Sequence, residues 1–162
     1  MESKAKLLGH SLHQMLVVFP LGLLATSFAF DIVFLATHDS SFAVVSFWMI
    51  SAGIIGALAA AIFGFIDWLA IAPGTRAKTL GVWHGAGNVI VVLLFIVSWM
   101  IRQPVTSVVP NGWAIALSLI GVLLAMITGW LGGELVDRLG VGVDEGANLN
   151  APSSLSRRPA RG

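Results

Sequence analysis

The chain has 162 residues, of which 57% are hydrophobic and only 10% are charged, and its formal net charge is +1. Because soluble domains carry about 25% charged residues, this composition excludes a large water-soluble domain, and the net charge gives no support for nucleic acid as a partner. The chain has no cysteine, which excludes disulfides, thiolate-bound metal ions, iron–sulfur clusters and covalently attached haem.

Four long apolar runs follow a short basic lead at residues 1–10. Each run has the roughly 20 residues that an α-helix needs to cross the ~30 Å hydrocarbon core of a bilayer. The first run is too long for a signal peptide and contains Pro20 and Asp31, so we expect a retained helix that Pro20 kinks. The predicted membrane-spanning helices cover about residues 11–36, 42–70, 80–101 and 113–136.

The residues at the ends of these runs indicate how the chain crosses the membrane. All six tryptophans lie near the ends of runs, which is typical of aromatic belts at membrane interfaces. If the N-terminus is cytoplasmic, eight of the nine lysines and arginines lie on the cytoplasmic side and only Arg102 lies outside. We therefore predict an all-α, integral membrane four-helix bundle over residues 11–146, with both termini in the cytoplasm (N-in, C-in). Residues 147–162 have no periodicity and predict a disordered cytoplasmic tail.

Small residues recur about once per turn on the second and fourth predicted helices. The two stripes consist of Gly53, Gly56, Ala60 and Gly64, and of Gly121, Ala125, Gly129 and Gly133. Because lipid provides no hydrophobic drive between helices, their close approach depends on small residues. The stripes therefore predict tight packing within the monomer or in a homo-oligomer, with membrane lipids around the remaining surface.

Short matches between the two halves suggest an internal repeat. Leu8-Gly9 precedes His13 much as Leu80-Gly81 precedes His84, and an acid follows a glycine at the end of the second and fourth helices. A duplicated helical hairpin would explain these matches, and chance is the alternative for matches this short.

Several polar side chains fall at the cytoplasmic end of the predicted bundle. They are His10 and His13 in the first helix, Asp67 at the end of the second, His84 and Asn88 in the third, and Glu134 and Asp137 at the end of the fourth. Ionisable groups at membrane depth are costly and are usually functional or paired. Asp31 lies towards the opposite side, where we expect a hydrogen bond to a serine or a backbone group of a neighbouring helix.

The first hypothesis for this cluster is a b-type haem. A haem in a four-helix bundle needs histidine ligands from two facing helices. His13 and His84 are the best pair because they lie at similar depth on different helices, with His10 and Asn88 beside them. Asn88 or an acid would hold the second ring nitrogen of a ligand.

Two other hypotheses use the same residues. His10, His13 and His84, with Asp67 or Glu134, would form a nitrogen and oxygen shell for a transition metal ion. Alternatively, the histidines cap helix ends and pair with the acids, without any cofactor, in a structural or assembly partner protein. Nothing in the sequence decides whether the protein is an enzyme.

Taken in order, these residues resemble a bacterial membrane family catalogued as domain of unknown function 2231. Its most specific marks are Gly9-His10-x-Leu12-His13 and Trp130-x-Gly132-Gly133-Glu134, and the resemblance covers about residues 8–145. Members often have proline after both early histidines, whereas this chain has Ser11 and Gln14 there.

The resemblance implies four transmembrane helices in the inner (cytoplasmic) membrane of a bacterium, and no established activity. Some relatives look fused to cytochrome c domains, an association that favours a redox role. We therefore predict electron transfer through a haem b, with a redox or assembly partner protein.

Overall fold

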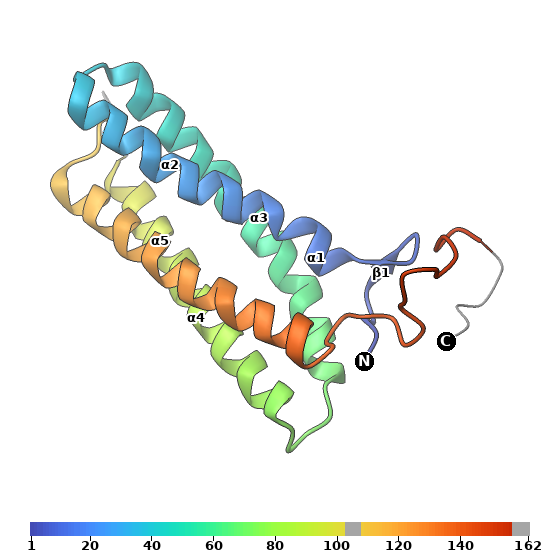
Figure 1. Ribbon diagram of the computed structural model, residues 1–162. Coiled ribbons are helices and arrows are strands. Elements are labelled where there is room, and N and C mark those ends of the chain that lie inside the picture. Colours follow the sequence, from blue (N-terminus) through green and yellow to red (C-terminus); the bar gives the residue numbers. More distant parts are fainter. Residues whose placement is uncertain (103–107, 157–162) are drawn as a thin grey trace.

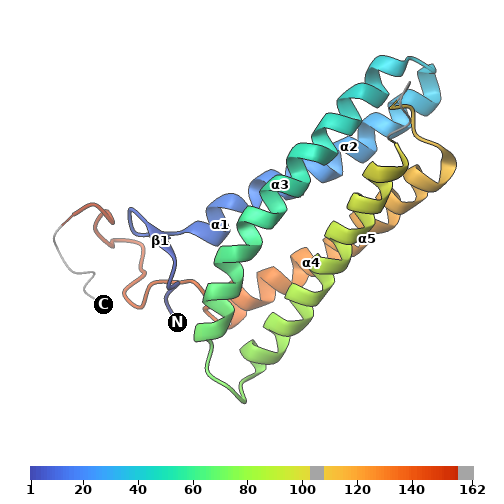
Figure 2. The same cartoon turned by 180° about the vertical axis from the view of Figure 1, so that it is seen from behind.

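Four long helices form two antiparallel hairpins that pack against each other (Figures 1 and 2). The computed structural model of the protein describes residues 1–102 and 108–156. The first hairpin consists of α2 (Val18–Thr37) and α3 (Ser40–Ala70), and the second of α4 (Arg76–Ile101) and α5 (Gly112–Gly133). The shorter elements are strands β1 (Lys6–Leu7) and β2 (His10–Ser11), helix α1 (Leu12–Leu16) before α2, and the π-helix η1 (Glu134–Arg138) after α5.

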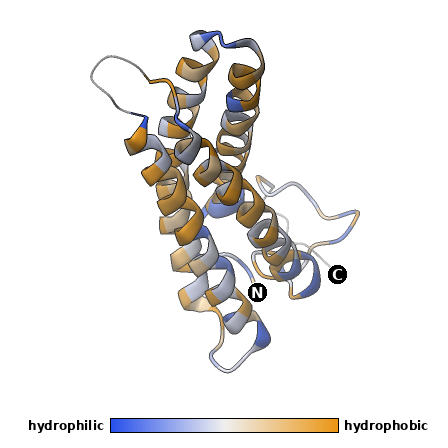
Figure 3. Cartoon of the chain, turned by 90° about the vertical axis from the view of Figure 1, so that its left-hand side faces the viewer, coloured by the Kyte–Doolittle hydropathy of each residue, from blue (hydrophilic) through white to orange (hydrophobic). Residues whose placement is uncertain are grey.

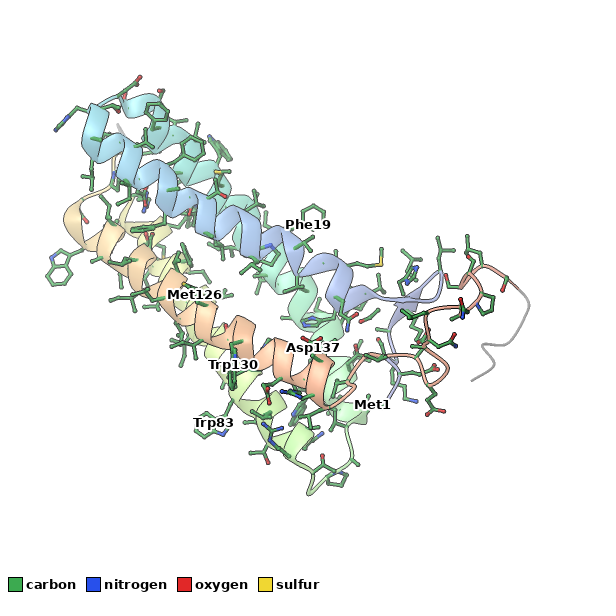
Figure 4. All side chains as sticks on the ribbon, viewed as in Figure 1. Met1, Phe19, Trp83, Met126, Trp130 and Asp137 are labelled. Carbon is green, nitrogen blue, oxygen red and sulfur yellow. The ribbon has the colours of Figure 1, made fainter. Side chains whose placement is uncertain are left out.

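The predicted all-α architecture with four membrane-spanning helices is confirmed. By length and composition, four segments can cross a membrane: Leu12–Thr37, Ser40–Ala70, Arg76–Ile101 and Gly112–Arg138. Hydrophobic residues extend along all four helices (Figure 3). The outer surface carries large apolar side chains that point away from the bundle (Figure 4), namely Phe19, Trp83, Met126 and Trp130. This surface matches lipid rather than water as its solvent.

The first membrane-spanning segment is interrupted at Val17, between α1 and α2. Pro20 has no amide proton, so the carbonyl of Leu16, four residues earlier, has no helical donor. The helical bonding resumes around the interruption, because the amide of Val17 donates to His13 (3.0 Å) and that of Leu21 donates to Val17 (3.2 Å). The missing hydrogen bond therefore lies one turn before Pro20, whereas Val17 itself keeps right-handed helical dihedrals (φ −61°, ψ −21°).

The small residues of α3 bring it close to α2. A Cβ atom at Gly53 would lie only 2.6 Å from Cδ2 of Leu24. On α5, a Cβ at Gly121 would lie 2.7 Å from Cε2 of Phe95, whereas at Gly129 and Gly133 it would meet nothing within 4 Å. The α3 stripe thus packs inside the monomer, but the α5 stripe turns outward after Gly121.

The same contacts reveal a structural repeat between the two hairpins. Leu24 lies against Gly53 as Phe95 lies against Gly121. Leu24 and Phe95, on the first helix of each hairpin, are 71 positions apart in the sequence. Gly53 and Gly121, on the second helix of each hairpin, are 68 positions apart. The predicted repeat therefore has a defined register, set by interhelical contacts rather than by the short sequence matches.

Asp31 and Arg102 form a buried ion pair at the end of the bundle away from the termini. Both are fully buried, and the guanidinium donates to the two carboxylate oxygens of Asp31 at 2.6 Å each. The other three N–H groups donate to the hydroxyl oxygens of Ser46, Ser98 and Ser118 at 3.1–3.2 Å. These residues come from all four long helices, so the cluster ties the two hairpins together. The expected partner of Asp31, a serine or a backbone group, is corrected: it is Arg102.

The N-terminal hairpin of β1 and β2 packs against the segment after η1. Leu8 and Gly9, both with positive φ, form its two-residue turn. The side chain of Lys6 pairs with Glu2 and Asp144. Residues 147–156 contain turns without helix or strand, and the hydroxyl of Ser154 donates to Leu8 (3.0 Å). The rest of the predicted tail, 157–162, lies outside the described residues.

Acidification is expected to loosen this N-terminal hairpin. The hydrogen bond from Lys6 holds the pKa of Glu2 below its ordinary value, while Asp144 and Glu2 raise the pKa of Lys6. The Glu2 contribution is therefore present at neutral pH and is lost as the pH falls below about 4.3. The Lys6 contribution disappears only when the pH rises above about 10.4.

Amide hydrogen exchange of residues 2–11 at pH 3 and pH 7, corrected for the intrinsic rate, measures this effect. Protection should fall at pH 3 and stay constant between pH 6 and pH 8. Equal protection at pH 3 and pH 7 would show that the ion pairs do not hold the hairpin.

Candidate functional site

His13 on α1 and His84 on α4 lie close together between the two hairpins. Their ring centroids are 6.3 Å apart and their planes are nearly perpendicular, at 87°. Both side chains are half-buried. The structure therefore brings together the pair of histidines that the sequence favours as ligands from two facing helices.

Each ring is oriented by a backbone carbonyl of the other helix in its own hairpin. Nδ1 of His13 lies 2.9 Å from the carbonyl oxygen of Ala60, and Nδ1 of His84 lies 2.9 Å from that of Thr128. A carbonyl oxygen can only accept, so Nδ1 must carry the proton in both rings. In the neutral rings, Nε2 is then the unprotonated nitrogen and can bind a metal.

Glycines make room for both rings. A Cβ atom at Gly64 would lie 2.8 Å from Cε1 and Nδ1 of His13, and one at Gly132 would lie 3.1 Å from Cε1 of His84. On α3 the acceptor residue Ala60 lies one helical turn before Gly64, and on α5 Thr128 lies one turn before Gly132. The site thus follows the same 71- and 68-residue repeat as the packing contacts.

Asn88 lies beside His84 but does not hold its second ring nitrogen. Its Nδ2 donates to the backbone carbonyl of His84 (2.9 Å) and lies at similar distances, 3.5 and 3.3 Å, from Nδ1 and Nε2 of the ring. A donor on the lone pair of one nitrogen would be much farther from the other. In this arrangement the carbonyl of Thr128, rather than the amide of Asn88, orients the ring.

The other predicted ligands do not join the two histidines. His10 is an exposed residue of β2 and lines a surface recess of about 410 Å³. The carboxylate of Asp67 accepts from the hydroxyl of Ser3 (2.8 Å) and the amide of Lys4 (2.7 Å). Glu134 pairs with Arg76 at 2.7 Å, and Asp137 is exposed.

The described residues do not assemble the predicted shell for a transition metal ion. Among residues 1–102 and 108–156, no group of three or more His, Asp or Glu side chains is placed to hold a metal ion. The physical reason is that Asp67 already has partners in the N-terminal segment and Glu134 already pairs with Arg76 at the start of α4. Of the predicted ligands within the described residues, His13 and His84 are the two that lie together.

Sequence reasoning missed the groups that orient the rings. They are the carbonyls of Ala60 and Thr128 and the nearby glycines Gly64 and Gly132. Every residue has a backbone carbonyl, so the sequence cannot show which carbonyls act as acceptors. The available signal was the small residue one turn after each acceptor position, repeated 68 residues later in the chain.

One comparison with known proteins bears on this arrangement. A family model described as "Predicted membrane protein (DUF2231)" matches residues 9–145, which include all four long helices and both histidines. No curated protein and no solved structure matches the chain.

Proposed function

Because the chain belongs to the DUF2231 family of predicted membrane proteins, we propose a function within the membrane, namely electron transfer through a haem b held by His13 and His84. The observation that carries this proposal is the matched orientation of the two rings, each with Nδ1 donating to a carbonyl. This arrangement fixes the tautomer in which Nε2 is the metal-binding atom and raises the basicity of the ligand.

The number of available ligands favours haem over a bare metal ion. A zinc site takes three or four protein ligands, and the described residues offer only the histidine pair here. A haem needs only axial ligands from the protein. When bound, its iron accepts and releases one electron.

The spacing of the rings is consistent with two ligands on one metal atom. A metal–imidazole bond is about 2.0–2.1 Å long, so two imidazoles bound to one metal atom would have ring centres at most roughly 6–6.5 Å apart. The observed centroid distance is 6.3 Å. The two rings come from different hairpins, so the ligand would be bound between the two halves of the bundle.

The orientation we propose places this site near the cytoplasmic face of a bacterial inner membrane. The N-terminus lies at the same end of the bundle as α1, which carries His13 (Figure 1), and its amino group donates to the carbonyl of Gly140 after η1. Among the described residues, the basic side chains at that end of the bundle are Lys4, Lys6, Arg76, Lys78 and Arg138. The apparent exception, Arg102, is fully buried against Asp31 and is therefore not a loop charge. The positive-inside rule then favours cytoplasmic termini.

A reduced-minus-oxidised visible spectrum of the detergent-purified protein, expressed with ample haem and iron, tests the function. We expect the sharp Soret and α bands of a six-coordinate haem. His13→Ala and His84→Ala should each remove these six-coordinate bands, either by loss of one ligand or by loss of the haem itself. The matched control His10→Ala should keep them, because His10 lies outside the site.

Metal analysis on the same sample separates the alternatives. A colourless protein with stoichiometric metal would contradict the haem and favour a metal-binding membrane protein. A colourless, metal-free but folded protein would instead favour a structural or assembly partner without a cofactor.

A further inference from the structure

The two histidines have equivalent carbonyl contacts but different polar neighbours. Beside His84 lie the side chains of Asn88 and Thr128, both hydrogen-bonding groups. The residues 71 and 68 positions earlier, which occupy the equivalent places beside His13, are Val17 and Ala60. Neither has a polar side-chain atom, so the two halves of the site are held differently.

Asn88 and Thr128 join α4 to α5 at the level of His84. The hydroxyl of Thr128 donates to Oδ1 of Asn88 (3.0 Å), and Nδ2 of Asn88 donates to the carbonyl of His84 (2.9 Å). The methyl group of Thr128 fills the space above Gly87, where a Cβ would be 2.5 Å away. These contacts fix the register of the two helices and therefore the position of the carbonyl that orients the His84 ring.

The backbone that carries His13 is less continuous. α1 ends at Leu16, whose carbonyl Pro20 leaves without its helical donor, so one hydrogen bond of the helix is missing one turn after His13. The equivalent of Pro20 in the second hairpin is Val91, inside the uninterrupted helix α4. The missing helical hydrogen bond and the missing polar side chains therefore both occur on the His13 side of the site.

We propose that Asn88 and Thr128 are positioning residues that fix His84, and that His13 is the ligand that a small neutral diatomic molecule can replace. The second part rests on the proposed function, since it needs an iron atom between the rings. The first part concerns only the protein and can be tested without a cofactor.

The first experiment uses the full-length apo-protein in detergent, labelled with ¹⁵N-histidine. Long-range ¹H–¹⁵N spectra report the tautomer of each ring and the exchange rate of its Nδ1 proton. We expect the His84 proton to exchange about tenfold more slowly than that of His13, because its surroundings open less often. Thr128→Val, which keeps the methyl group but loses the hydroxyl, should remove this difference.

Thr128→Ser is the matched control, because it keeps the hydroxyl and should preserve the slow exchange at His84. Equal rates at His13 and His84 in the unmodified protein would overturn the positioning role. So would faster exchange in Thr128→Ser but not in Thr128→Val, since a packing role alone would follow the methyl group rather than the hydroxyl.

The second experiment adds haem and carbon monoxide. We expect His13→Ala to retain haem and to bind carbon monoxide at once after reduction, and His84→Ala to lose the haem. The reverse pattern, or loss of haem in both variants, would overturn the inequivalence of the ligands. Failure of the unmodified protein to take up haem would contradict the proposed function, and the exchange rates would still decide whether His84 is the fixed histidine.

Discussion

Replacing Asp31 with leucine is expected to lower the free energy of unfolding by about 3–5 kcal/mol, because the substitution leaves the guanidinium of Arg102 buried without its counter-ion. Both side chains are fully inaccessible, and the three serine hydroxyls around Arg102 cannot neutralise its charge. The cluster also joins α2, α3, α4 and α5, so its loss should weaken the contact between the hairpins. Equilibrium unfolding in detergent micelles, followed by circular dichroism, measures the change.

The double variant Asp31→Leu/Arg102→Met distinguishes a missing partner from a missing favourable interaction. Removing both charges leaves no unpaired ion, so stability should recover substantially relative to Asp31→Leu. Asp137→Leu is the control, since this carboxylate is exposed at the opposite end and should change stability little. Equal losses in the single and double variants would show that the pair itself, rather than an orphaned charge, determines stability.

Replacing Gly121 with valine is the second substitution from which we expect a large loss, of about 1–3 kcal/mol. A Cβ at this position would lie 2.7 Å from Cε2 of Phe95, a side chain with no exposed surface in the core between the hairpins. The ring cannot move away without displacing its neighbours in that core, which include Leu24 and Ile50.

Gly129→Val on the same helix is the matched control for this substitution. Both variants change glycine to the same β-branched residue in α5, so their effects on helix propensity are similar. A Cβ at Gly129 meets nothing within 4 Å, so its unfolding midpoint should stay close to that of the unmodified protein. Equal destabilisation by the two variants would mean that helix propensity, not the contact with Phe95, explains the result.

These two glycines show which part of a predicted packing stripe makes contacts in the structure. The sequence predicts one stripe through Gly121, Ala125, Gly129 and Gly133, because all four share a helix face at ideal spacing. The structure packs Gly121 but leaves Gly129 and Gly133 open, and it places Thr128 and Gly132 against α4 instead. A spacing rule cannot decide this, because the crossing of two helices selects which residues remain in contact along their length.

The candidate site also contains a part that the sequence could predict and a part that it could not. That His13 and His84 face each other could be predicted, since both lie near the start of an apolar run at the same predicted membrane depth. The sequence also predicted that His10, Asp67 and Glu134 would join them, but the structure does not place them there. Asp67 and Glu134 have nearer partners, and His10 faces the surface. Depth in a membrane is a one-dimensional property, whereas ligation needs three-dimensional convergence.

The sequence by itself determined the class of protein, the four membrane-spanning helices and the polar residues worth following, because hydropathy is summed over some 20 neighbouring residues and needs no knowledge of contacts. Only the tertiary structure decided that Asp31 pairs with Arg102 and that Ala60 and Thr128 orient the histidines. These interactions join residues 44–71 positions apart, and two of them use backbone carbonyls, which every residue has. Their specificity therefore lies in the packing of the two hairpins.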